Sequence, residues 1–456
     1  MSAGETATSR HPIPGMSRAY RFPPFERRIL GNGIELVTAP VRKLPIVTVL
    51  ALVDAGAACD RGELGGTARL TAKVMLEGTQ RHDGATLVEQ FEQLGATVDA
   101  DPDWDGAVFS MTVLSVNLPP ALSLLAEVLH TPRFDEREVS RLKEERLAEL
   151  MQLRSEPRGL ADEAFARFTY KPTSRYAYPE GGTPESVATI TVDEVKRFHV
   201  TRYVPTRSSI IVVGDVSHED AELHVANALG NWQGPVGERA AGDDSPAETT
   251  RHTWLVEKAG APQSELRIGH VGIPRNHPDY FPVVVMNAIL GGLFSSRINL
   301  NLRETHGYTY GAYSRFEWRR QRGPFVVSTA VETAMTANAA KEIILEIERI
   351  RAAPVAEEEL TLVTSYLDGV FPIQYETTAA IAKALSVLVR YGLPRDYFDS
   401  YRTNIRNVSR EDVLQAARSH LHPESLQMVI VGDTTTVRDL IAPLNFGPIS
   451  MHDWDG

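Results

Sequence analysis

The sequence predicts an α+β fold of two homologous domains, each a mostly antiparallel sheet covered by helices. Three observations predict it: a long internal repeat, a helix followed by a strand in each copy, and a linker-like stretch between the copies. The 456 residues are 43% hydrophobic and 23% charged, which suits an ordinary globular chain long enough for several domains.

The repeat is visible in two matching segments. Thr191-Val-Asp-Glu-Val195 is followed by Ser208-Ser-Ile-Ile-Val-Val-Gly-Asp215, and Ser409-Arg-Glu-Asp-Val413 by Gln427-Met-Val-Ile-Val-Gly-Asp433. The Val-to-Gly spacing is 19 in both copies (214 minus 195, 432 minus 413), and the period is 218 residues (432 minus 214). The chain therefore reads as a duplication of nearly half its length.

Each copy opens with a helix-capping pattern. Thr191 with Glu194, and Ser409 with Asp412, place an acidic residue three positions after a hydroxyl, which predicts the start of a helix. The β-branched runs that follow predict buried strands over Ile210–Val213 and Met428–Val431. The same patterns predict helices over Phe134–Leu153 and Val355–Phe371, and strands over Pro45–Val53, Ala107–Leu114, Leu266–Val271 and Phe325–Val331.

The stretch from Asn231 to Thr250 is rich in Gly, Pro, Ala and acidic residues and has no hydrophobic period, which is typical of a linker. We therefore expect an N-terminal extension (1–24), an N-terminal domain (25–230), a linker (231–250), a C-terminal domain (251–448) and a tail (449–456).

Charge and composition exclude several classes of protein. Lys plus Arg number 47 against 59 Asp plus Glu, a net charge of -12, so the surface repels nucleic acids and anionic membranes. No apolar run resembles a signal peptide or reaches the ~18 residues of a membrane span. We expect no nucleic acid, no membrane and a cytoplasmic location, with a periplasmic one left open. The single Cys59 cannot form an internal disulfide.

No zinc motif can be written from this sequence. None of the 13 His has a second His at i+4, the spacing that puts two ligands on one helix face. His420-Leu421-His422 is too closely spaced for one face, and we expect it at the surface. We therefore expect no metal in this chain.

Two segments carry a family resemblance: Gly65-Gly-Thr-Ala-Arg-Leu-Thr-Ala-Lys-Val-Met-Leu-Glu-Gly-Thr79 and Leu302-Arg303-Glu304-Thr305-His306-Gly307-Tyr308-Thr309-Tyr310. The chain resembles, over nearly its whole length, the pitrilysin or insulinase family of zinc metallopeptidases, in the branch of short subunits related to mitochondrial processing peptidase. The resemblance implies the same duplicated two-domain fold.

The resemblance also shows a departure from the family. Active members carry His-x-x-Glu-His on the first helix, where two His bind zinc and Glu is the general base; these positions are Arg69, Ala72 and Lys73 here. The family's third ligand matches Glu149, but one carboxylate does not hold zinc where three protein ligands are the norm. The cations at Arg69 and Lys73 add repulsion.

The other half of the family's active site is present. The family's Arg, and a Tyr seven positions later, match Arg303 and Tyr310. A guanidinium can hold a substrate carbonyl, and a phenol can donate to the oxyanion of an attacked peptide. The alternative is that Arg303 is a helix surface charge and Tyr310 a core residue of a strand.

The resemblance thus implies a non-catalytic, substrate-binding subunit of a heterodimeric zinc metalloendopeptidase that degrades peptides. Arg303 and Tyr310 would act in the active site of a homologous catalytic subunit that carries His-x-x-Glu-His and the zinc. The isolated chain is expected neither to hydrolyse peptides nor to retain zinc. Two alternatives stay open: a structural or peptide-holding subunit like the core proteins of respiratory complexes, and a homodimer with a remodelled site around Glu149.

Overall fold

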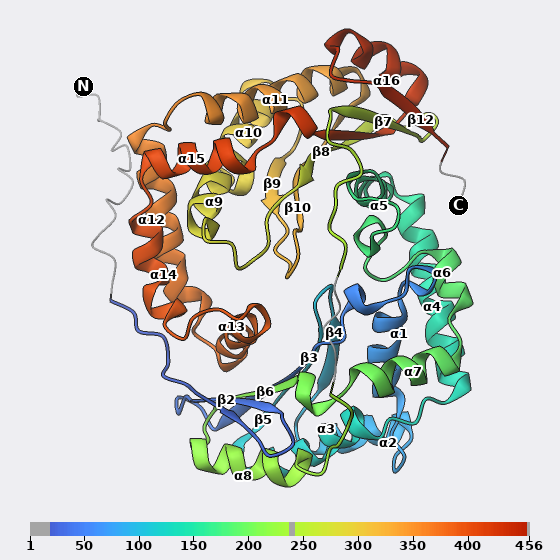
Figure 1. Cartoon of the computed structure of the whole chain (residues 1–456), viewed down its shortest axis with the longest axis vertical. Helices are drawn as coiled ribbons and strands as arrows, with labels where there is room; N and C mark the ends of the chain where they lie inside the picture. Colours follow the sequence, from blue (N-terminus) through green and yellow to red (C-terminus); the bar gives the residue numbers. More distant parts are fainter. Residues whose placement is uncertain (1–18, 237–241, 454–456) are drawn as a thin grey trace, which may run out of the picture.

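The computed structural model describes residues 19–236 and 242–453, and within them the chain forms two six-stranded sheets (Figure 1). The first has the order β1-β2-β6-β3-β5-β4 and the second β12-β7-β11-β8-β10-β9. The strands of the first sheet are β1 (Glu26–Ile29), β2 (Glu35–Pro40), β3 (Ile46–Val53), β4 (Val98–Pro102), β5 (Ala107–Leu114) and β6 (Ser208–Gly214). Those of the second are β7 (His252–Glu257), β8 (Gln263–Val271), β9 (Ala312–Phe316), β10 (Pro324–Glu332), β11 (Gln427–Gly432) and β12 (Ile449–His452).

Helices surround both sheets. Those of the N-terminal half are α1 (Thr67–Val74), α2 (Gly84–Gln93), α3 (Leu118–His130), α4 (Glu136–Ser155), α5 (Pro157–Thr169), α6 (Pro184–Thr189), α7 (Val192–Arg202) and α8 (His218–Leu229). Those of the C-terminal half are α9 (Tyr280–Asn287), α10 (Arg297–Asn299), α11 (Thr336–Ala352), α12 (Glu357–Gln374), α13 (Thr378–Tyr391), α14 (Tyr397–Arg406), α15 (Arg410–His420) and α16 (Thr434–Ile441).

The two halves repeat one topology. β2, β6, β3, β5 and β4 occupy the same order in the first sheet as β7, β11, β8, β10 and β9 in the second. Equivalent elements keep the spacing found in the sequence: α15 begins 218 residues after α7 (410 minus 192), and β10 begins 217 after β5 (324 minus 107). The duplication is confirmed.

Most strand pairs are antiparallel, as the α+β prediction requires. The parallel pairs are β2 with β6, β7 with β11, and β7 with β12. β5 has the bounds predicted for it, and the two capping patterns are observed: the hydroxyls of Thr191 and Ser409 accept from the amides of Glu194 and Asp412. The predicted fold class is confirmed.

Each sheet is covered on one face by a helix from the other half of the chain. α5 packs on β8 and β11, whereas α13 packs on β3 and β6 (Figure 1). Because side chains alternate along a strand, Ile210 and Val212 of β6 join the core of their own half, and Ile211 and Val213 pack with α13. The halves therefore complete each other's cores.

The described parts of the expected extension, linker and tail all contact the C-terminal half. The described end of the N-terminal extension is bound to the C-terminal half, where the ring of Phe22 stacks on Phe398 at 4.3 Å. The described part of the linker is also tied down, since Arg322 pairs with Asp244 at 2.8 Å. The expected tail contains β12, which adds a parallel strand beside β7, because the exposed amides of an edge strand accept another strand.

One stretch of the described chain, Tyr280–Thr305, is long and apolar enough to cross a membrane by length and composition alone, although no such run was expected. It is not one continuous helix, since Leu293 is extended (φ -120°, ψ 160°) between two π-helical turns, Ala288–Gly292 and Leu300–Thr305. Half of its apolar window is buried, and residues such as Met286 and Leu290 lie in the C-terminal core. The packing is that of a core segment.

Candidate functional site

The degenerate zinc motif lies on α1, and a buried carboxylate fixes where this helix begins. The amides of Gly66 and Ala68 each donate to Asp60 over 2.8 Å, and Arg175 lies 3.3 Å from the same carboxylate. Burial raises the pKa of Asp60 to about 6, although Arg175 and the two amides oppose that rise. Asp60 thus satisfies the first amides of α1, which lack partners within the helix.

The positions that would bind zinc are held in ion pairs. Nη1 of Arg69 lies 3.9 Å from Glu180, and Nζ of Lys73 lies 3.2 Å from Asp99. The matching carboxylate, Glu149, is paired with Arg146 at 2.9 Å. Imidazoles are absent here and cations take their places, so these residues do not fit a zinc ion.

The position of the family's general base is also changed. Ala72 is fully buried in the N-terminal core and offers no proton acceptor. Close by, Glu180 faces Arg69, and burial, reinforced by the charge of Asp103, raises the pKa of Glu180 to about 7. The positive charges near Glu180 therefore do not fully offset the cost of burying its carboxylate.

A pocket of about 310 Å³ lies between the two halves and includes Arg146 in its wall. Trp104 and Leu150 line it from the N-terminal half, and Glu317 and Arg319 line it from the hairpin of β9 and β10. The guanidinium of Arg319 stacks on Trp104, 4.4 Å from the ring centroid. The residues around the degenerate motif thus face the C-terminal half.

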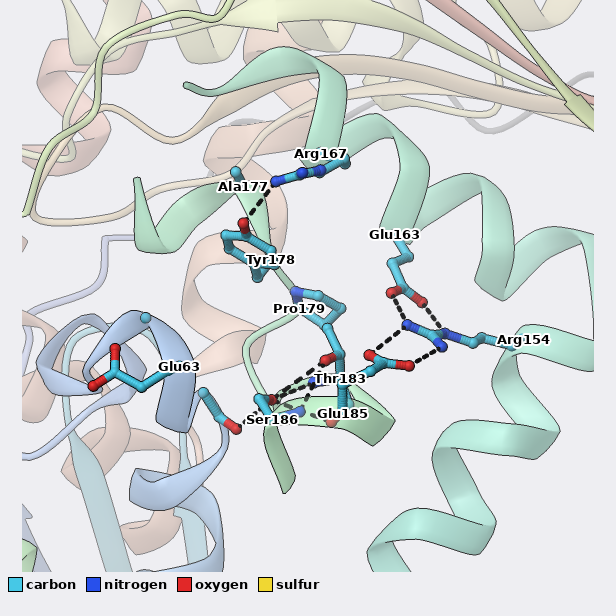
Figure 2. A pocket seen from close by; sticks show the side chains of 12 residues that line it. Glu63, Arg154, Glu163, Arg167, Ala177, Tyr178, Pro179, Thr183, Glu185 and Ser186 are labelled. Atoms are coloured by element: carbon cyan, nitrogen blue, oxygen red, sulfur yellow. Dashed lines mark hydrogen bonds and ion pairs between the residues drawn. The ribbon is translucent and has the colours of Figure 1, made fainter. Parts of the chain in front are cut away.

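A second pocket, of about 500 Å³, adjoins the first, and both include Glu163 and Tyr178 (Figure 2). Arg154 reaches into it between Glu163 and Glu185 and pairs with each at 2.8 Å. Because these three charges satisfy one another, Arg154 ties α4 to α5 and α6, and this trio is not free to react with a ligand.

Arg303 and Tyr310 lie at the surface of the C-terminal half. Tyr310 is 93% exposed, in the loop before β9, which excludes the alternative of a core tyrosine. Arg303 lies in the π-helical turn Leu300–Thr305, and its guanidinium stacks over the ring of Phe294 at 4.7 Å. Phe294 is itself 69% exposed. π-Helical turns often mark functional positions.

Buried polar contacts hold this surface in place. The side-chain amide of Asn299 donates to the carbonyl of Phe294 at 2.7 Å and accepts from the amide of Ala312 at 3.1 Å. Thr329 of β10 donates to the hydroxyl of Thr309 at 3.0 Å. The backbone on both sides of Arg303 and next to Tyr310 is therefore fixed, while the two side chains point outward. Sequence reasoning missed Phe294 and Asn299.

The degenerate motif on α1 and the pair Arg303 and Tyr310 do not contact each other through hydrogen bonds or ion pairs in the described structure. The ion pair of Arg303 is with its neighbour Glu304, at 3.4 Å. Among the described residues, the hydroxyl of Tyr310 has no hydrogen-bond partner, whereas the guanidinium of Arg303 is shared between Glu304 and the ring of Phe294.

Sequence reasoning also missed a cluster of possible metal ligands. His277, Asp279 and His420 offer ligand atoms that all lie within 4.8 Å of one another. His420 is buried, so its expected surface position was wrong. The separation of 141 residues between Asp279 and His420 hides this cluster from any spacing rule.

Two family models match the chain: "Insulinase (Peptidase family M16)" over residues 37–176 and "Peptidase M16 inactive domain" over residues 189–366. The chain belongs to peptidase family M16. Its match to the inactive-domain model is consistent with a non-catalytic M16 member, and the replaced ligands on α1 agree with this.

Similar proteins extend over most of this M16 chain. The crystal structure of a peptidase M16 inactive domain from Pseudomonas fluorescens is 28% identical, with a TM-score of 0.84 over 90% of this chain and 98% of that one. The non-peptidase homolog YmxG of Helicobacter pylori is 24% identical over 84% of this chain and 88% of that protein. The probable mitochondrial-processing peptidase subunit beta of Arabidopsis thaliana is 25% identical over 62% of this chain and 54% of that protein.

Proposed function

We propose that this M16 chain is the non-catalytic, peptide-binding subunit of a heterodimeric zinc endopeptidase. Its partner is a homologous chain that carries His-x-x-Glu-His and the zinc. The observation that carries the proposal is the contrast between ion-paired cations at the ligand positions and the exposed hydroxyl of Tyr310, seven residues after the partly exposed guanidinium of Arg303.

The exposure of Tyr310 supports the proposal because an aromatic ring gains free energy when it leaves water. Burying a large apolar side chain stabilises by about 1.5 to 3 kcal/mol. Here the ring stays 93% exposed although the loop beside it is fixed by Thr309 and Thr329. A side chain held out in this way is suited to meet a ligand or another chain.

The chemistry of the two groups fits peptide hydrolysis. The guanidinium of Arg303 would donate to a carbonyl oxygen of the bound peptide. The hydroxyl of Tyr310 would donate to the oxyanion that forms on the scissile carbonyl. The zinc-bearing partner would supply the activated water. The stack on Phe294 would hold the guanidinium plane in a fixed orientation before substrate arrives.

The relatives support a shared assembly. One similar protein is named as a subunit of a processing peptidase and another as a non-peptidase homolog. A chain that has lost its own ligands but belongs to this family needs a zinc-bearing sister in order to take part in cleavage.

The test is Tyr310→Phe in the complex of the two chains. Removal of one oxyanion donor typically lowers turnover by ~10² to 10³. We therefore expect kcat for peptide cleavage to fall by about that factor, while the two chains still elute together in gel filtration.

The matched control is Tyr366→Phe on α12, another exposed tyrosine of the same half, which should leave kcat unchanged. If Tyr310→Phe cleaves peptide at the wild-type rate in an intact complex, Tyr310 has no part in catalysis. The chain would then be a structural or peptide-holding subunit.

A further inference from the structure

A group of metal-ligating side chains lies apart from the degenerate motif, between two helix ends of the C-terminal half. His277 and Asp279 precede α9, and His420 is the last residue of α15. These two helices pack against each other. The three side chains meet although they come from segments far apart in the sequence.

The geometry of the group is close to that of a three-ligand metal site. Nε2 of His420 donates to Oδ2 of Asp279 at 2.7 Å, and Nδ1 of His277 lies 4.0 Å from the same oxygen. The two imidazole rings stand edge to face with centroids 4.9 Å apart. Ligands of a tetrahedral zinc ion lie about 3.3 Å from one another, given bonds of about 2.0 to 2.1 Å. Small side-chain rotations therefore suffice.

The group opens onto a pocket. His277 and His420 both line a cavity of about 410 Å³, which gives a metal ion a path to the site and leaves room for water as a further ligand.

Nδ1 of His277 accepts from the backbone amide of Asp279 at 3.1 Å, so both pairings of His277 and His420 are with Asp279, whereas the other two histidines of this pocket have other partners. His270 donates from Nδ1 to the carbonyl of Val271 at 2.9 Å and accepts at Nε2 from the amide of His422. His422 pairs with Glu424 at 3.3 Å. Of the four histidines that line this pocket, His277 and His420 are the two whose ligand atoms lie within 4.8 Å of each other and of a carboxylate.

We propose that His277, Asp279 and His420 form a site for a divalent transition metal, and that this metal is zinc. Two imidazoles and one carboxylate form a ligand set common in zinc proteins that keep an open position. The negative end of the α15 dipole lies beside His420 and favours a cation there. This site shares no residue with the degenerate motif, and it revises the expectation that the isolated chain retains no zinc.

The bound ion would join the start of α9 to the end of α15. α9 leads directly into the π-helical turn Ala288–Gly292, and Arg303 lies in the next such turn, Leu300–Thr305. Zinc at this position would therefore stabilise the base of the segment that displays Arg303, because a ligand that binds the folded state alone raises its stability.

The experiment is zinc titration of the metal-stripped full chain, followed by desalting and elemental analysis. We expect one zinc per wild-type chain and a rise in the melting temperature on adding zinc chloride. Asp279→Asn keeps an acceptor for His420 but removes the charge, so it should weaken zinc binding by at least about tenfold. His277→Ala should do the same.

Two variants serve as controls. His422→Ala lies in the same pocket and Glu149→Gln in the degenerate motif; both should bind zinc as the wild type does. The proposal is overturned if the wild type binds no zinc, if Asp279→Asn binds it equally well, or if either control variant loses it.

Discussion

Burial disfavours the charged form of Glu180, whose carboxyl lies beside Arg69 of the replaced zinc motif. Its carboxyl lies 3.9 Å from Arg69, too far for a strong hydrogen bond, and burial raises its pKa to about 7. An acid whose pKa is raised in the folded state binds its proton there when the unfolded chain has already released its own. The folded state therefore loses stability as pH rises.

Glu180→Gln should remove this pH dependence. The carboxyl of the unfolded chain titrates near pH 4.3, so the cost of Glu180 develops from about pH 4 and is complete above about pH 7. We expect the free energy of unfolding of the variant, relative to wild type, to increase over this range and then to level off. Urea unfolding at a series of pH values measures it; a constant difference between the two proteins would show that Glu180 titrates normally.

The site residues differ in how far the sequence predicts them. Arg303 and Tyr310 follow from the family resemblance, because they match the family's Arg and the Tyr seven positions later. Phe294 does not, because its role depends on a stack formed across a turn that Asn299 closes. His277, Asp279 and His420 come together only when α9 and α15 pack, so no local pattern indicates them.

At the scale of the elements, hydrophobic periodicity predicts where strands and helices lie but not what covers them. The bounds of β5 and the start of α15 follow from alternation and from a capping pattern. The exchange of α5 and α13 between the halves does not, because a buried face has the same composition whichever sheet it contacts. For the same reason the sequence did not predict β12. Its four residues form a strand by pairing with β7, which lies far away in the sequence.

Because α13 of the C-terminal half packs on the N-terminal sheet, a change in α13 should affect that sheet. Leu385 is fully buried between α13 and the N-terminal sheet, and Leu→Ala at such a site costs about 2 to 5 kcal/mol. Leu385→Ala should therefore lower amide protection in β3 and β6, strands of the opposite half, as hydrogen exchange would show. Lys383→Ala, at an exposed position on the same helix, is the control and should change little. Loss of protection confined to the C-terminal sheet would contradict the exchange.

At the scale of the whole molecule, the two halves are bound to each other by more than the two helices. Arg267 of β8 pairs with Asp162 of α5 at 2.6 Å, and Arg320 pairs with Asp54 of the N-terminal half at 2.6 Å. Ion pairs therefore join the two halves in addition to the helices, and Tyr310 lies exposed on the surface of the C-terminal half. In the proposed complex, donors held in place in this way would stabilise a transition state without first being rearranged.

The central claim is that this chain completes the active site of a zinc-bearing sister. Its most direct test is a peptide cleavage assay on each purified chain alone and on an equimolar mixture. The account predicts no turnover by this chain, weak or no turnover by the sister, and full activity only in the mixture. Cleavage by this chain alone, or a sister whose activity does not respond to its addition, would contradict it.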